Sequence, residues 1–127
     1  MSKTIISTPN APAAIGPYSQ AVVHNGVVYC SGQIALDAAT GALLEGDVAQ
    51  QAQKTLENLS AVLDAAGSSL NNALRLTVFL KDMNDFAAVN EVYKTFFTDS
   101  PPARACVEVS RLPKDVLVEI DAIAAVG

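Results

Sequence analysis

Residues 19–31 read SQAVVHNGVVYCS, and this stretch decides the kind of fold that the chain can adopt. Two apolar runs rich in valine flank Asn25-Gly26, a pair that suits the positive φ angles of a type I′ turn. The stretch therefore predicts an antiparallel β-hairpin. His24, the only histidine, abuts the expected turn, and we interpret it as a solvated turn residue and not as a catalyst.

Helical and extended patterns alternate after the hairpin. Asp47 with Gln50 three residues later is typical of a helix start, apolar residues then recur at helical spacing, and Gly67 marks the end. The rest of the chain predicts strand 73–80, helix 85–97, strand 102–109 and strand 116–126. We expect the second helix to bury one stripe, formed by Phe86, Val89, Tyr93 and Phe96 or Phe97. Residues 1–127 are thus expected to form one α+β domain, with two helices on one face of a sheet.

The composition limits the classes of function. Half of the residues are hydrophobic and only 17% are charged, so we assign the surplus apolar surface to contacts within a homo-oligomer. No apolar run is long enough to span a membrane, and the N-terminus lacks the apolar core of a secretory signal, which predicts a cytoplasmic protein. A net charge of −5 argues against binding nucleic acid. Without a Gly-rich phosphate loop or a His/Cys cluster, neither a cofactor nor a metal is expected.

Arg104 and Glu119 are the candidate catalytic residues, because each interrupts an apolar, strand-like run. If Val107 and Val109 point to the core, strand alternation places Arg104 on the face away from the helices, and the same reasoning places Glu119 there. Leu117 and Ile123 share that face, so we expect other subunits to cover it. An arginine fork can hold a carboxylate and a glutamate can move protons, whereas the alternative is an internal ion pair of Arg104 with Glu119 or Glu108.

The remaining polar groups narrow the chemistry. Tyr18 and Ser31 are candidate polar partners for a bound ligand. Cys106 is close to Arg104 in sequence, but a buried strand cysteine is usually inert, and we interpret Cys30 and Cys106 as small buried side chains. Binding of a carboxylate combined with proton transfer suits a reaction that is already easy, such as hydrolysis of an imine.

Six motifs in order along the chain resemble the Rid family of reactive intermediate deaminases, also called the YjgF or L-PSP family. The motifs are Gly16-Pro17-Tyr18-Ser19-Gln20-Ala21, Ser31-Gly32-Gln33, the segment 84–90, Pro102-Ala103-Arg104, Arg111-Leu112-Pro113 and the segment 119–124. The match extends over nearly the whole chain, which makes it far more specific than any single motif.

This resemblance implies a chorismate-mutase-like α+β fold, assembled as a homotrimer with sites between subunits. It implies hydrolysis of enamine/imine intermediates, 2-aminoacrylate or 2-aminocrotonate, to 2-oxo acids and ammonia, without a cofactor. Arg104 then matches the carboxylate-binding arginine, and Glu119 matches the acid that positions water. The substrate-binding positions of the family correspond to Tyr18, Ser31, Gly32 and Asn90. Cys106 corresponds to a further such position, which contributes mainly backbone contacts.

Two other functions stay open at this stage. One is a non-catalytic sensor of 2-oxo acids, for which Arg104 would suffice. The other is a ribonuclease or translation inhibitor, against which the acidic charge and the lack of a catalytic histidine count. The chain departs from close relatives at Ala105, where serine is frequent, and in the short segment 98–100, which bears on the rim of the cleft.

Overall fold

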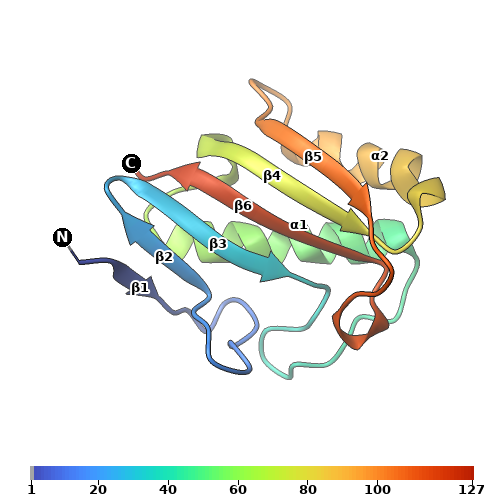
Figure 1. Ribbon diagram of the computed structural model, residues 1–127, viewed down its shortest axis with the longest axis horizontal. Helices are drawn as coiled ribbons and strands as arrows, with labels where there is room; N and C mark the ends of the chain where they lie inside the picture. The colour runs from blue at the N-terminus through green and yellow to red at the C-terminus, as the bar shows by residue number, and fades with distance from the viewer. Residues whose placement is uncertain (1) are drawn as a thin grey trace.

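The chain folds into a single six-stranded sheet with two α-helices against one of its faces, as seen in a computed structural model that describes residues 2–127 (Figure 1). This arrangement confirms the predicted α+β class with both helices on one side. The elements are β1 Thr4–Ile6, β2 Ala21–His24, β3 Val27–Gln33, α1 Val48–Ala65, β4 Ala73–Leu80, α2 Phe86–Phe96, β5 Ala103–Glu108 and β6 Val118–Ala125.

The sheet is mixed, with the strand order β1-β2-β3-β6-β4-β5. All neighbours are antiparallel except β4 and β5, which are parallel because α2 carries the chain back between them. The last strand, β6, therefore lies in the middle of the sheet. It pairs with β3 on one side and β4 on the other, which places Glu119 near the beginning of an interior strand of the sheet.

The hairpin that the sequence predicts is confirmed. Asn25 and Gly26 have φ angles of 51° and 75°, as a type I′ turn requires, and His24 pairs with Val27 across it. One strand was not predicted: β1 adds to the hairpin through the pairing of Ile5 with Val22. Three residues are too few for an alternating pattern to be recognised, so this strand is visible only in the context of its neighbour.

The core lies between the sheet and α1. Leu56, Leu59 and Leu63 of the helix are fully buried, and so are Val118 and Ile120 of β6. The helix begins with the predicted capping box: Asp47 Oδ1 accepts a hydrogen bond from Gln50 N at 2.9 Å, and Gln50 Oε1 accepts one from Asp47 N at 2.9 Å. The chain leaves the helix at Gly67, whose φ of 77° favours glycine.

The second helix agrees with its predicted bounds to within one residue at each end, but its apolar stripe is only partly buried. Val89, Tyr93 and Phe97 are in the core, and the rings of Tyr93 and Phe97 lie 4.6 Å apart between centroids. The prediction that Phe86 belongs to the same core is wrong, since this side chain is 37% exposed at the beginning of α2. Its ring instead faces the side chain of Arg104.

The other face of the sheet has no helix over it (Figure 1). Tyr29 of β3 and Ile123 of β6 are paired across this face, and Tyr29 is 48% exposed. Val107 of β5, which is 41% exposed, pairs with Phe79 on the same face. Apolar side chains therefore lie on an uncovered sheet surface, together with the carboxyl groups of Glu119 and Asp121.

Candidate active site

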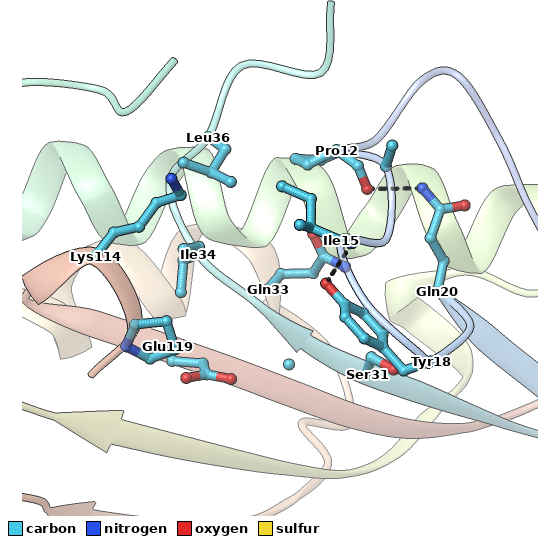
Figure 2. A pocket seen from close by; sticks show the side chains of 13 residues that line it. Pro12, Ile15, Tyr18, Gln20, Ser31, Gln33, Ile34, Leu36, Lys114 and Glu119 are labelled. Atoms are coloured by element: carbon cyan, nitrogen blue, oxygen red, sulfur yellow. Dashed lines mark hydrogen bonds between the residues drawn. The ribbon is translucent and has the colours of Figure 1, made fainter. Parts of the chain in front are cut away.

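A cavity of about 590 Å³ opens where the loop before β2 meets the end of β3 and the turn before β6 (Figure 2). Its walls include four of the residues that the sequence predicted for the site. These are Tyr18, Ser31, Gly32 and Glu119. The volume falls within the range that is usual for small-molecule sites.

Ser31 and Gly32 reach the cavity because β3 is irregular at this point. The register between β3 and β6 shifts between Cys30 and Gln33, so the two residues between them leave the regular ladder. Ser31 is anchored there, since its Oγ donates to the carbonyl of Ser19 at 2.6 Å and its backbone N–H donates to that of Gln20 at 3.0 Å. The irregularity thus brings β3 backbone against the cavity.

Glu119 supplies the acid–base group. Burial raises the pKa of its carboxyl group, and the nearby charge of Asp121 raises that pKa further. The carboxyl group lies against Gly32, where any side chain at that position would collide with Glu119 Oε2. A half-buried carboxyl group with a raised pKa can exchange protons with a ligand at a pH closer to neutral than an ordinary glutamate can.

The loop before β2 forms the opposite wall and is organised by Gln20. The buried amide of Gln20 accepts a hydrogen bond from Thr8 N at 2.7 Å and donates to the carbonyls of Thr8, Ala11 and Pro12. The Pro12 contact is visible in Figure 2. Farther along the loop, Tyr18 is 52% exposed, and its hydroxyl accepts from Ile15 N at 3.3 Å.

Arg104 lies outside this cavity, on the helix-covered side of the sheet. It pairs with Leu76 of β4, a fully buried core residue, and paired residues point to the same face. Glu119 pairs with Phe79 of β4. Phe79 lies an odd number of residues from Leu76 on the same strand, so Phe79 and Glu119 point to the opposite face of the sheet. The prediction that Arg104 and Glu119 share the open face is therefore wrong. It rested on a buried Val107, which is exposed on the edge strand β5.

The guanidinium of Arg104 contacts α2. Its Nη1 donates to Asn90 Oδ1 at 2.6 Å, and its Cζ lies 4.8 Å from the ring centroid of Tyr93 and 5.4 Å from that of Phe86. Asn90, which was predicted as a substrate-binding residue, thus contacts Arg104 in this structure. Cys106 follows two positions later on the same face of β5.

The alternative of an internal ion pair is also wrong for the described chain. Between residues 2 and 127 the ion pairs are Glu91 with Lys94 and Arg111 with Asp115, and neither includes Arg104. Glu108, one proposed partner, instead accepts a hydrogen bond from Met83 N at 2.8 Å. The charge of Arg104 is therefore available to an anion.

The other candidates for nucleophile or base are unfavourable. Burial raises the pKa of the Cys30 thiol to about 12, and the pKa of Cys106 is raised by burial although the charge of Arg104 opposes this. Both thiols are thus protonated and weakly nucleophilic. His24 ends β2 and is absent from the cavity walls.

In the part of the chain described here, no three His, Cys, Asp or Glu side chains form a metal-binding group, and no helix is long and apolar enough to cross a membrane.

Sequence reasoning missed two features of the site. Lys114 lines the cavity from the turn before β6, and Phe86 with Tyr93 flanks Arg104. Lys114 reaches the cavity from a left-handed backbone conformation with φ of 55°, for which a lysine gives no local signal. The aromatic spacing on α2 was recognised, and it was assigned to the core alone.

Fold and site define an α+β protein with a cavity for a small molecule, one acid–base carboxyl group and one available arginine. The family model described as Endoribonuclease L-PSP matches residues 8–126, so the chain belongs to this family, which confirms the Rid resemblance of its motifs. The chain is 56% identical over 127 residues to a 2-iminobutanoate/2-iminopropanoate deaminase of Salmonella typhimurium, covering 98% of each chain. It is 56% identical over 122 residues to a RutC family protein of Pyrococcus horikoshii, covering 96% of this chain and 97% of that one.

Solved structures agree with this assignment. The crystal structure of E. coli TdcF with bound serine superposes with a TM-score of 0.92 at 49% identity, covering 98% of this chain and 99% of that one. Several relatives are named deaminases, which supports an enzymatic role for this chain.

Proposed function

We propose that the protein is a 2-iminobutanoate/2-iminopropanoate deaminase, which hydrolyses reactive enamine and imine intermediates such as 2-aminoacrylate and 2-aminocrotonate. The observation that carries this proposal is the half-buried Glu119 carboxyl group, which has a raised pKa and lies in a cavity with Tyr18 and Ser31. The protein named as this deaminase in Salmonella typhimurium, 56% identical over 98% of the chain, supports the same reaction.

The chemistry requires one water and one general acid–base group. The reacting species is the imine, which forms from the enamine when a proton moves from nitrogen to carbon. Ionised Glu119 takes a proton from water as the oxygen bonds to the imine carbon, the C=N electron pair moves to nitrogen, and Glu119 returns the proton to that nitrogen. Glu119 then takes the hydroxyl proton of the carbinolamine and passes it to the nitrogen as the C–N bond breaks, which releases ammonia and leaves a 2-oxo acid. Arg104 binds the substrate carboxylate through its planar fork. No cofactor takes part in this sequence.

Two copies of the chain are needed for this site. Within one chain Arg104 and Glu119 lie on opposite faces of the sheet, so the two side chains of a single copy do not converge on one small ligand. A site that uses both is therefore formed by Arg104 of one copy and Glu119 of another. We place this site in a homotrimer in which the open sheet faces pack against other subunits, and we expect the assembly in the cytoplasm.

The direct experiment adds the protein to a threonine dehydratase reaction under conditions in which hydrolysis of the released intermediate limits the rate. We expect faster appearance of 2-oxobutyrate. Arg104→Ala should abolish the acceleration, and Arg104→Lys should weaken it because a lysine ammonium cannot hold a carboxylate bidentately. The absence of any acceleration by the native protein would refute the deaminase proposal.

A second candidate is a non-catalytic sensor of 2-oxo acids. It is favoured by one observation: Arg104 lies away from the Glu119 cavity of its own chain and carries no ion pair within residues 2–127. Glu119→Gln separates the two functions. If the protein is a deaminase, Glu119→Gln should lose turnover while it still binds 2-oxobutyrate. If the protein is a sensor, the wild type shows no turnover and Glu119→Gln should keep its binding.

Ribonuclease activity, which the family description names, is disfavoured on electrostatic grounds. The net charge of −5 repels a polyanion, and His24 does not line the cavity. We expect no cleavage when single-stranded RNA is incubated with the protein at the protein concentration that accelerates imine hydrolysis.

A further inference from the structure

The guanidinium of Arg104 is contacted by several side chains of one helix, although the residue is exposed. Three side chains of α2 contact its guanidinium: Asn90 through a hydrogen bond of 2.6 Å, and Phe86 and Tyr93 through their rings at 5.4 Å and 4.8 Å. These residues stand at positions i, i+4 and i+7, so they form one stripe along the helix. The arginine is therefore held by a single rigid element.

Tyr93 contributes its ring and not its hydroxyl group. Within residues 2–127 its buried Oη has no hydrogen-bond partner, although buried hydroxyl groups usually have one. The ring, by contrast, is packed against Phe97 and lies under the guanidinium. Phe86 lies within cation–π distance of the same guanidinium.

We propose that Phe86 and Tyr93 are positioning residues, which hold the Arg104 guanidinium by cation–π contact so that its free donors face a carboxylate. The proposal rests on the role of Arg104 in the proposed function. It assigns to α2 a task that the apolar pattern of this helix does not indicate.

The hydrogen-bond pattern of the guanidinium fits this role. Asn90 occupies Nη1, whereas Nε and Nη2 make no hydrogen bond to any residue from 2 to 127. These two atoms form one edge of the fork and can bind both oxygens of a carboxylate. An arginine that is already held in one rotamer loses less conformational entropy when the ligand binds, which increases affinity.

The first test follows the mobility of Arg104 without any substrate. The ¹⁵Nε–¹Hε resonance of Arg104, assigned by its loss in Arg104→Lys, should show a high heteronuclear NOE and an upfield ring-current shift. Phe86→Leu and Tyr93→Leu should lower the NOE and reduce the shift. Tyr93→Phe should change neither, because the ring is retained. Phe96→Leu is the control: it makes the same change on the same helix, at a ring that is not among those within cation–π distance of Arg104.

The second test measures binding of 2-oxobutyrate by calorimetry and turnover by the dehydratase assay. Phe86→Leu and Tyr93→Leu should each weaken binding about 3- to 10-fold and raise KM more than they lower kcat, while Tyr93→Phe stays near the wild-type value. Phe86 is exposed, so Phe86→Leu tests the idea even if Tyr93→Leu is unstable. Unchanged mobility of Arg104 and unchanged affinity in Phe86→Leu would overturn the proposal.

The outcomes also separate this inference from the proposed function. If the NOE and the affinity change as expected but the native protein does not hydrolyse imines, the positioning role stands and the deaminase proposal fails. If Arg104→Ala binds 2-oxobutyrate as tightly as the native protein, Arg104 does not bind the carboxylate, and the positioning of its fork has no consequence for the ligand.

Discussion

Gly32 and the carboxyl group of Glu119 lie in direct contact across the β3–β6 interface, and a Cβ atom on Gly32 would stand 2.9 Å from Glu119 Cδ and would overlap Oε2. The φ angle of Gly32 is one that other residues adopt, so the glycine is needed here for space and not for backbone freedom. The position of the acid–base group thus depends on the absence of a side chain on the neighbouring strand.

The substitution Gly32→Ala tests this dependence. The added methyl group should displace the Glu119 carboxyl group by an ångström or so, and a shift of that size is expected to lower kcat by roughly 10²-fold. The dehydratase assay measures the effect, and the thermal midpoint shows whether the fold is kept. Combined with Glu119→Gln, Gly32→Ala should cause little further loss, because both act through the same carboxyl group. Full activity in a correctly folded Gly32→Ala would contradict the assigned contact.

The raised pKa of Glu119 predicts a cost to stability. A carboxyl group whose pKa is raised by folding binds its proton more tightly in the folded state, so stability is highest below the unfolded-state pKa and is lost as the pH rises through the folded-state pKa. Glu119→Gln removes the ionisable group. We expect its thermal midpoint to exceed that of the wild type at pH 7.5, with the difference narrowing as the pH falls toward about 4. A wild type that is the more stable of the two at pH 7.5 would exclude this account.

Asp121 supplies a matching prediction for activity. If ionised Glu119 is the base, the acidic limb of the kcat/KM profile follows the pKa of Glu119 and should lie above its ordinary value of 4.5. Asp121→Asn removes the neighbouring charge that raises this pKa, and should move the limb to lower pH. Asp115→Asn serves as the control, since Asp115 is not among the groups that shift the pKa of Glu119. If the acidic limb stays at the same pH in Asp121→Asn, that limb does not report the pKa of Glu119.

The elements that the sequence predicted well are those specified by neighbouring residues. The hairpin follows from Asn25-Gly26, and α1 from the capping pair Asp47 and Gln50 with its apolar spacing. Such signals act over a few residues, so one sequence is sufficient to recognise them. The same reasoning placed Glu119 on the open face, because β6 is a central strand whose alternate residues are buried.

The face of Arg104 was predicted wrongly for a physical reason. In the edge strand β5 no residue is fully buried, so alternation gives two faces but does not identify the core side. That choice is made by α2, whose Phe86, Asn90 and Tyr93 contact the guanidinium. Contacts between elements far apart in sequence are not visible in either segment alone.

Gln20 should contribute to stability through the loop that it organises. The substitution Gln20→Met keeps the length of the side chain but removes its four hydrogen bonds, leaving the N–H of the buried Thr8 without its partner. We expect the free energy of unfolding to fall by about 1–3 kcal/mol, the usual cost of an unsatisfied buried group. Denaturation by urea at a fixed protein concentration measures it. Gln53→Met, at an exposed position of α1, should change stability by less than about 0.5 kcal/mol.

The open sheet face provides the test of assembly. Tyr29 is 48% exposed in one chain and pairs with Ile123, so a trimer that packs this face would bury both side chains. Tyr29→Lys places a charge in that interface, which is costly when the charge is buried without a partner. By light scattering we expect a native mass of about three times 13.2 kDa for the wild type and a shift toward 13.2 kDa for Tyr29→Lys.

The same substitution also tests whether the site needs two copies. Leu44→Lys, at a position outside the sheet that is 37% exposed, is the control for added charge and should keep the native mass. If catalysis combines Arg104 and Glu119 from different copies, activity should fall together with the mass as Tyr29→Lys is diluted, since monomers hold the two residues on opposite faces. Full activity in a preparation of monomers would mean that one chain suffices, and that Arg104 is not part of the reaction at Glu119.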